Sequence, residues 1–388
     1  MHELGGTAPR RSWHDRAMSA RVLGAALAIT FASGCAPAAP PSECIEGSSP
    51  DLLPSGRDES VPDTGCPGLV IAGNPPPPYT MNIGGRELVL RGGFAWERQG
   101  DRLCRIPEQG ATGYYEPPLF DGFADAFVVE GCVLSRTADD GSRVPVGRDF
   151  AAGFEGVDDV CALVSPVHRF TAFTLQSPRA PEIPDYVALR NRVCGEGAPF
   201  LDNTLTVIAD AAHEGSRGLR CFAVPQDATL AAGGHPSKSS IETEVMHFVR
   251  GDVARIELWL RVVHGLPLGL LDLETTFVAS RPGPRLLVTE DGHFEGELKW
   301  GDKPRFPSLP GASTIPIGRW FHLVVELALE PDETGHMRVT VDDEVVIDAD
   351  GPTLPMPNTI LNSLELGLTS SIVETTLDVD DVLVSGGP

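Results

Sequence analysis

Cysteine is the residue type with the most distinctive chemistry in this chain of 388 residues, which contains eight of them. They are Cys35, Cys44, Cys66, Cys104, Cys132, Cys161, Cys194 and Cys221. A metal site would need a spacing such as C-x-x-C or clustered histidines, and neither occurs. No motif of a catalytic thiol flanks any of the eight. We therefore expect disulfides. They would stabilise the part of the chain up to Cys221, and the rest would depend on its hydrophobic core for stability.

The first cysteine follows a segment typical of a secretory leader. Residues 22–31 form an apolar stretch that is too short for a membrane span, which needs about 20 residues. Residues 32–35, Ala-Ser-Gly-Cys, resemble the bacterial lipobox. The resemblance implies cleavage before Cys35, lipid on its thiol, and export to the cell envelope. Ala36 after the cysteine resembles lipoproteins sorted to the outer membrane. The alternative is an ordinary secretory leader that ends near a cysteine by chance.

The state of Cys35 sets the disulfide count. If it carries lipid, eight minus one leaves seven cysteines, an odd number, so three disulfides and one thiol are the simplest outcome. If it is unmodified, four disulfides can form. Connectivity does not follow from sequence, but proximity along the chain suggests the pairs Cys44–Cys66, Cys104–Cys132 and Cys194–Cys221.

The chain is acidic, with 54 Asp and Glu against 30 Lys and Arg and a formal net charge of −24. Such a field repels nucleic acid and anionic lipid surfaces, so we expect no nucleic acid as a partner and a membrane only through the lipid on Cys35. The negative charge also disfavours a strongly anionic polysaccharide as a ligand, unless a local basic patch or bound cations make the binding surface positive. Four basic residues on candidate strands could form such a basic strip across one sheet: Arg255, Arg261, His264 and Lys299.

Composition divides the chain into four parts. Residues 1–35 are the leader and lipobox, and residues 36–65 are a tether rich in proline and serine. Short apolar runs separated by turn residues predict a disulfide-supported β-rich domain over residues 66–190. Residues 191–388 show the clearest strand patterns and form the last predicted domain.

The candidate side chains must be positioned by strands, which the alternation of apolar and polar residues predicts. Residues 254–260, Ala-Arg-Ile-Glu-Leu-Trp-Leu, alternate as expected of a strand with one buried face, and residues 337–341 do the same. Asp291-Gly292 is a strong hairpin signal. About ten such segments after residue 190 suit a two-sheet sandwich. The expected fold class is therefore mainly β.

Three segments are similar to concanavalin A-like and laminin-G-like jelly-roll domains. Residues 318–326, Gly-Arg-Trp-Phe-His-Leu-Val-Val-Glu, and residues 338–346, Arg-Val-Thr-Val-Asp-Asp-Glu-Val-Val, resemble that family's W-hydrophobic-H and V-x-V-D-G-x-x-V signature. Residues 377–384 resemble its closing strand. The resemblance implies a C-terminal jelly-roll sandwich. The family has Asp-Gly where this chain has Asp342-Asp343, from which we expect a different turn type.

The resemblance also gives expectations for single residues. Trp320 opens an apolar strand and is expected to anchor the core, and His322 is expected to be packed or to lie on the strand surface. Asp380 and Asp381 could contribute to a structural Ca²⁺ site, because related jelly rolls often hold one. Alternation would send these two side chains to opposite faces, so at most one would point inward. We expect no other metal or cofactor.

Enzymes that share this fold provide tests for catalysis. Glucanases resemble one another in an E-x-D-x-x-E strand of paired carboxylates, and no such string occurs; Glu274, Glu295 and Glu297 lie on candidate strands without a pairing signal. Lyases need a base, often Tyr or His, beside cations that neutralise a uronate. Residues 191–388 contain no tyrosine, although the basic strip could supply the cations.

The chain lacks the G-x-S-x-G and H-E-x-x-H motifs and a phosphate-binding glycine loop, so no catalytic residue is identified. We therefore expect a non-catalytic lipoprotein of the cell envelope that binds glycan or protein through its sandwich. A polysaccharide lyase or glycoside hydrolase and a structural envelope component are the alternatives, because one fold hosts many functions.

Overall fold

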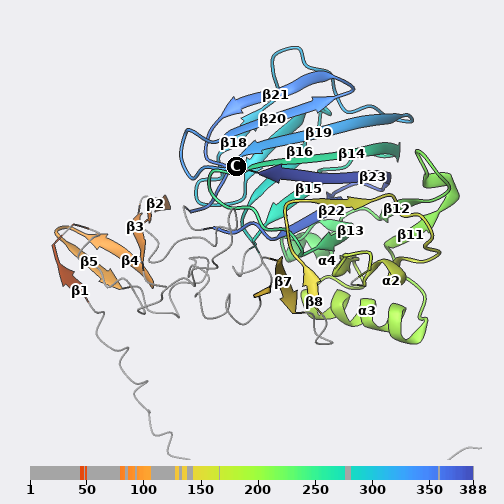
Figure 1. The fold of residues 1–388 in the computed structure, drawn as a ribbon, viewed down its shortest axis with the longest axis horizontal. Coiled ribbons are helices and arrows are strands. Elements are labelled where there is room, and N and C mark those ends of the chain that lie inside the picture. The colour runs from red at the N-terminus through yellow and green to blue at the C-terminus, as the bar shows by residue number, and fades with distance from the viewer. Residues whose placement is uncertain are drawn as a thin grey trace, which may run out of the picture. The chain divides into compact units, whose positions relative to one another are not determined.

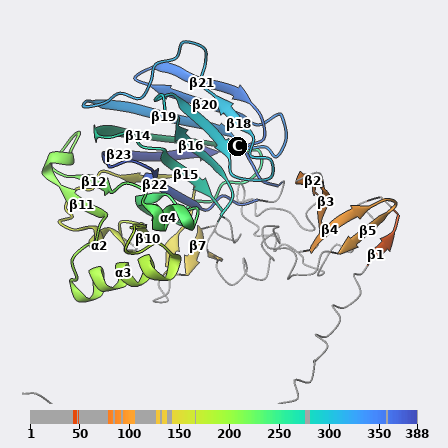
Figure 2. The same cartoon turned by 180° about the vertical axis from the view of Figure 1, so that it is seen from behind.

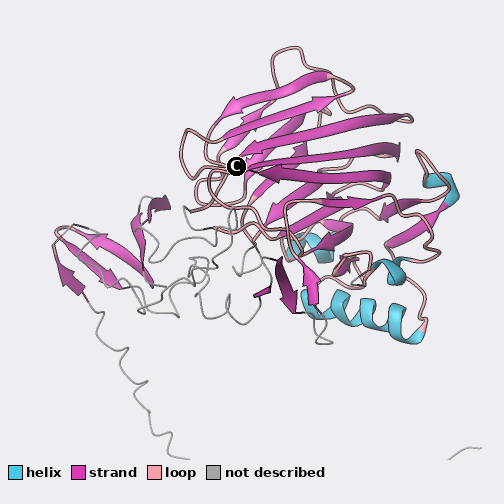
Figure 3. Cartoon of the chain, viewed as in Figure 1, coloured by secondary structure: helices cyan, strands magenta, loops and turns pink. Residues whose placement is uncertain are grey.

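The computed structural model describes residues 44–47, 49, 79–83, 86–91, 94–105, 127–130, 133–137, 143–165, 167–275, 281–356 and 359–387. Within these residues the chain is mainly β, as expected (Figure 3). No described helix is long and apolar enough to cross a membrane.

The larger of two sandwich sheets has eight antiparallel strands in the order β11-β12-β23-β14-β19-β20-β21, with β9 also paired to β23 (Figure 1). Their bounds are β9 Phe150–Ala152, β11 Thr204–Ile208, β12 Gly218–Ala223, β14 Val253–His264, β19 Trp320–Ala328, β20 His336–Val341, β21 Glu344–Asp350 and β23 Thr375–Gly387. The last strand of the chain therefore lies near the middle of this sheet.

The second sheet has seven antiparallel strands in the order β10-β13-β22-β15-β16-β17-β18 (Figure 2). Their bounds are β10 Ala172–Thr174, β13 Ser237–Thr243, β15 Gly269–Glu274, β16 Pro284–Val288, β17 Phe294–Leu298, β18 Arg305–Pro307 and β22 Ser363–Ser371.

One contiguous hydrophobic core fills the space between these two sheets. On β14 the predicted alternation is confirmed, because Ala254, Ile256, Leu258 and Leu260 are buried while the residues between them face outward. Leucines of β15 and β22 face them from the other sheet. Each fully buried leucine contributes about 1.5–3 kcal/mol. The expected two-sheet sandwich is therefore present.

Strands and helices that precede residue 191 also belong to the sandwich region. β9 and β10 are strands of the two sheets, and helices α2, Val160–Leu163, and α3, Ile183–Glu196, lie near them in the chain. α3 begins with a capping box formed by Glu182 and Asp185 and ends at Gly197, whose φ of 65° suits glycine. The shorter elements are the 3-10 helix η3, Ala209–Ala211, and helix α4, Ala228–Ala232.

Two small sheets come from the N-terminal part of the chain. A five-stranded sheet has the order β1-β5-β4-β3-β2, and its small core contains Val89, Trp96 and Leu103. A three-stranded sheet has the order β6-β7-β8. The bounds are β1 Cys44–Glu46, β2 Tyr79–Ile83, β3 Arg86–Arg91, β4 Phe94–Gln99, β5 Arg102–Arg105, β6 Phe127–Glu130, β7 Val133–Thr137 and β8 Arg143–Pro145.

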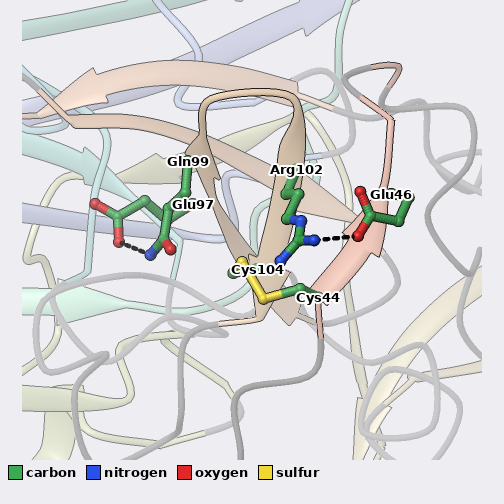
Figure 4. Close-up of a disulfide and its surroundings, with 6 residues drawn as sticks. All are labelled: Cys44, Glu46, Glu97, Gln99, Arg102 and Cys104. Atoms are coloured by element: carbon green, nitrogen blue, oxygen red, sulfur yellow. Dashed lines mark hydrogen bonds and ion pairs between the residues drawn. A yellow bond between two sulfur atoms is a disulfide. The ribbon is translucent and has the colours of Figure 1, made fainter.

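The observed disulfides differ from the pairs that proximity along the chain suggested. Cys44 and Cys104 are register partners on β1 and β5 and are joined by a disulfide, beside an Arg102–Glu46 ion pair of 2.6 Å (Figure 4). Cys161 and Cys194 join α2 to α3, with their Cα atoms 5.4 Å apart. The expected pairs Cys44–Cys66, Cys104–Cys132 and Cys194–Cys221 are therefore wrong, because strand pairing in one case and helix packing in the other bring together cysteines that are distant in the chain.

The remaining cysteines divide into two groups. Cys221 is a buried free thiol on β12, and burial raises the pKa of that thiol. Cys35, Cys66 and Cys132 lie outside the described residues.

The hairpin between β20 and β21 corrects the expectation of a different turn type. Asp342 and Asp343 form its two-residue loop, and both have positive φ, 47° and 70°. Type I′ turns require this conformation, which Asp-Gly also favours. The Asp342 carboxylate accepts a hydrogen bond from the backbone N–H of His322 at 2.9 Å and so helps to hold the turn without glycine.

Candidate functional site

A row of ionisable residues crosses the seven-stranded sheet. Backbone register places one residue of each strand from β13 to β18 side by side across the sheet. In order across the sheet these are Glu242, Glu365, Asp272, Arg285, Glu297 and Arg305. Their chain neighbours, such as Ile241, Leu366 and Leu273, belong to the core. Because side chains alternate along a strand, the row lies on the outer face of this sheet.

Charges on this face are arranged in two layers. The carboxylates are buried, with Glu242, Asp272, Glu274, Glu297 and Glu365 each at most 5% exposed. Five cations are more open, with side chains from 23% to 47% exposed: Lys238, Arg281, Arg285, Lys299 and Arg305. The surface thus presents ammonium and guanidinium groups above buried carboxylates. We call it the cation-capped face.

Each of these cations is held by a carboxylate. Lys238 Nζ lies 3.3 Å from Glu365 Oε2, and Lys299 pairs with Glu274. The hydroxyl of Ser240 donates to Glu365 Oε1 at 2.5 Å. Burial raises the pKa of Glu274 to about 7, against the lowering effect of the Lys299 charge. Burial also acts to raise the pKa of Glu365, but the charge of Lys238 and the Ser240 hydrogen bond lower it overall.

The arginines hold the rest of the face together. Arg281 pairs with Glu242 and lies 3.5 Å from Glu244, so it reaches from the loop before β16 to β13. Arg285 pairs with Glu297, and Arg305 joins the same carboxylate at 2.5 Å while also pairing with Glu295. This network fixes the cation heads in place and so lowers the entropic cost of binding an anionic group.

Helix α3 adds a tyrosine to the surroundings of this face. Burial raises the pKa of Tyr186, and the charges of Lys238, Glu365, Arg281 and Glu242 act on its phenol. The sequence analysis sought a tyrosine base within residues 191–388 alone, and that range contains none. α3 begins before that range, so sequence patterns within the last domain could not reveal Tyr186.

A pocket of about 560 Å³ lies beside the row, at the β16–β17–β18 side. The sheet contributes Arg285, Glu295 and Arg305 to its walls, and the loops contribute Gln226 and Ile372 among others. Its volume is in the range of small-molecule sites, and its lining combines cations, acceptors and apolar groups. Such a lining suits a polar ligand with both acidic and apolar parts.

The predicted basic strip does not form one surface. Arg255, Arg261 and His264 lie on β14 of the eight-stranded sheet, whereas Lys299 follows β17 of the other sheet. Lys299 alone belongs to the cation-capped face. Arg255 pairs with Glu257 at 2.7 Å and Glu326 at 2.8 Å.

The other two members of the strip differ in environment. His264 is 67% exposed and lies 3.8 Å from Glu374. Arg261 pairs with the buried Asp378 at 2.6 Å, and its guanidinium lies 4.8 Å from the centre of the Trp320 ring. Arg261 is therefore held in place by structural contacts.

Aromatic rings gather on the outer face of the eight-stranded sheet. The Trp259 ring is stacked between His213, at 3.8 Å, and His322, at 5.1 Å between ring centres, and Trp320 meets His213 edge to face. Trp320 is only partly buried, so the expectation that it anchors the core is wrong. Alternation gives the inward position to Phe321, which is fully buried. His322 lies on the strand surface, one of the two expected placements.

The expectation that the side chains of Asp380 and Asp381 lie on opposite faces of the sheet is also wrong. Asp381 has φ of 50°, and the register between β14 and β23 shifts at this point, which marks a β-bulge. Asp380 Oδ2 accepts from the backbone N–H of His213 at 2.7 Å, and Asp381 Oδ2 lies 2.9 Å from its Nδ1. The two carboxylates that we considered for Ca²⁺ therefore both hold His213.

No protein-family model matches the chain, and no curated protein matches it in sequence. Among solved structures it is similar to an endo-β-1,4-glucuronan lyase from the fungus Trichoderma reesei, with 13% identity and a TM-score of 0.38 over 48% of this chain and 87% of that one. It is also similar to the cellulose-induced protein Cip1, with 14% identity and a TM-score of 0.36, over 48% of this chain and 86% of that one. The alginate lyase Aly36B is similar with 9% identity and a TM-score of 0.34, over 62% of this chain and 97% of that one.

Proposed function

We propose that this protein binds acidic polysaccharide on the cation-capped face. The observation that carries the proposal is the layer of five cation heads, each paired with a carboxylate beneath it. The chain as a whole carries −24, and on this face the cation heads, rather than the buried carboxylates beneath them, lie where an anionic glycan would contact the surface. Uronate carboxylates would accept charge-assisted hydrogen bonds from the arginines and lysines.

The dimensions of the face suit a chain-like ligand. Glu242 and Arg305 stand at the two ends of the row, five strand spacings or about 24 Å apart, so a ligand that crosses the strands meets the paired cations in succession. The carboxylates between them can accept hydrogen bonds from sugar hydroxyls. A ligand that carries both carboxylates and hydroxyls matches this alternation of donors and acceptors.

Isothermal titration calorimetry with polyuronates and with a neutral glucan tests the proposal. Arg281→Gln should weaken polyuronate binding at least tenfold, because it removes a cation above Glu242 and Glu244. Arg255→Gln is the matched control, since Arg255 also bridges two glutamates but lies on the other sheet. Equal losses in the two variants, or equal affinity for the neutral glucan, would contradict the proposal.

A second candidate function is β-elimination of a polyuronate, which Tyr186 favours. In this reaction a base takes the proton from C5 of a uronate, the C4–O bond breaks with its electron pair on the leaving oxygen, and a C4=C5 double bond forms. Glu274, whose pKa burial raises to about 7, is the base that this face offers. A phenol whose pKa is raised by burial is protonated at neutral pH and could donate a proton to the leaving oxygen. Lys238 and Arg281 would neutralise the uronate carboxylate. Ultraviolet absorbance of unsaturated uronate, compared between the wild type and Tyr186→Phe, separates binding alone from cleavage.

We also propose that Cys35 carries lipid and that the protein is anchored in the cell envelope, where its partner is a membrane. Support comes from the leader-like residues 22–31 and the lipobox-like residues 32–35. Mass spectrometry of the mature N-terminus, with a Cys35→Ala variant, tests this. An unmodified N-terminal peptide, or unchanged membrane partitioning of the variant, would contradict it.

A further inference from the structure

Three carboxylates of the cation-capped face converge at its centre. Asp272 and Glu274 stand two residues apart on β15 and so share a face, and Glu365 is the register partner of Asp272 on β22. One carboxylate oxygen of each residue lies within 4.8 Å of the other two. All three side chains are at least nine-tenths buried.

Asp272 differs from the other two in its contacts. Lys299 pairs with Glu274, and Lys238 pairs with Glu365. Within the described part of the chain no cation contacts Asp272, and its buried Oδ1 has no hydrogen-bond partner. Arg285, its register partner on β16, pairs with Glu297 instead. A buried carboxylate oxygen without a partner carries the full cost of its desolvation.

The geometry matches a hard divalent cation. Calcium binds oxygen ligands at 2.3–2.6 Å, so two oxygens on one ion are at most about 5 Å apart. The three oxygens of the cluster satisfy that limit at 4.8 Å. We propose that Asp272, Glu274 and Glu365 bind Ca²⁺, with water or ligand oxygens in the remaining positions. This inference concerns the same face as the proposed function but does not depend on it.

The two lysines explain how the cluster is held without the ion. Each ammonium contacts one carboxylate, which leaves Asp272 as the member of the cluster that no cation contacts within the described residues. Lys299 is 23% exposed, so its side chain can turn toward water when an ion occupies the Glu274 side. Calcium and the Lys299 ammonium then compete for Glu274.

Calcium titration of the full chain after EDTA treatment tests the inference, with calorimetry and thermal unfolding as readouts and no glycan present. The wild type should bind one Ca²⁺ and gain several degrees in melting temperature, because an ion that binds only the folded state stabilises it. Asp272→Asn should melt higher than the wild type without calcium, because it removes a buried carboxyl group that no cation contacts, and should lose the calcium response. A merely structural Asp272 would instead make the variant melt lower.

Two further variants keep the test decisive if Asp272→Asn folds poorly. Lys299→Gln should bind calcium at least fivefold more tightly, since the competing ammonium is gone. The double variant Asp380→Asn/Asp381→Asn, on the other sheet, should keep the full calcium response. Absence of calcium binding by the wild type, unchanged affinity in Lys299→Gln, or loss of the response in the Asp380/Asp381 variant would each overturn the inference. None of these outcomes bears on polyuronate binding measured in EDTA.

Discussion

Replacing Arg220 and Arg261 together by glutamine should leave Asp378 as a buried carboxylate without a cation. Asp378 is fully buried on β23, between the two arginines in the register of the eight-stranded sheet. Arg220 donates to it from Nε at 2.7 Å and from Nη2 at 3.0 Å. Arg261 donates from Nη2 at 2.6 Å and from Nε at 3.0 Å. These bonds tie β12, β23 and β14 together.

The magnitude follows from what each variant leaves behind. A single substitution removes one arginine while the other still pairs with Asp378, so each should cost about 1–1.5 kcal/mol. Arg261→Gln should cost about 0.5 kcal/mol more, because Arg261 also lies over the Trp320 ring. The double variant leaves an uncompensated buried charge, which costs about 3–5 kcal/mol. At the midpoints of these ranges its loss should therefore exceed the sum of the single losses by about 1 kcal/mol.

Urea unfolding at pH 7 measures these free energies, provided that the m-value stays constant across the set. Adding Asp378→Asn to the double variant should restore about 2 kcal/mol, because the buried charge is then removed. Arg255→Gln, which breaks only partly exposed ion pairs, should cost less than about 1 kcal/mol. A double variant that loses less than about 2 kcal/mol, or whose loss is strictly additive, would refute this account of Asp378.

Three further predictions concern single sites. Burial raises the pKa of Asp380 to about 6, so the stability that its proton contributes is lost as pH rises through that value. Asp380→Asn can still accept a hydrogen bond from the backbone N–H of His213. Its free energy of unfolding should therefore rise by about 1 kcal/mol at pH 8, after allowance for solvent screening, and should not change at pH 4. Equal gains at both pH values in urea titrations would contradict this. Replacing Cys161 and Cys194 by serine opens a link across 33 residues and should cost about 3.5 kcal/mol, measured by thermal unfolding; a loss under about 1 kcal/mol would count against it. Cys221 should resist alkylation in the native protein and react only in urea, as peptide mass mapping would show, and rapid native modification would disprove its burial.

Local patterns were sufficient to predict the strands and the sandwich. Alternation over residues 254–260 identified the buried face of β14, and Asp291-Gly292 lies in the connection between β16 and β17. Both signals depend on neighbours along the chain, which is why sequence alone carries them. At the start of β19 the same alternation predicts that Phe321, rather than Trp320, faces the core, as the structure shows.

The site depended on information that local patterns lack. Alternation shows which face Asp272 and Glu365 occupy, but only strand pairing makes them neighbours, and that pairing joins distant parts of the chain. The same holds for Cys44 and Cys104, which meet because β1 pairs with β5. The bulge at Asp381 breaks the period of two, so counting residues along β23 gave the wrong face.

The position of β23 has a consequence for how the protein folds. This strand of 13 residues pairs with both β12 and β14, although more than a hundred residues separate it from either strand along the chain. Until Thr375 and the residues after it have left the ribosome, β12 and β14 each keep an unpaired edge open to other chains. Completing the sheet requires contacts between segments more than a hundred residues apart, which makes folding slow. The growing chain should therefore depend on chaperones that cover those edges until β23 pairs with them.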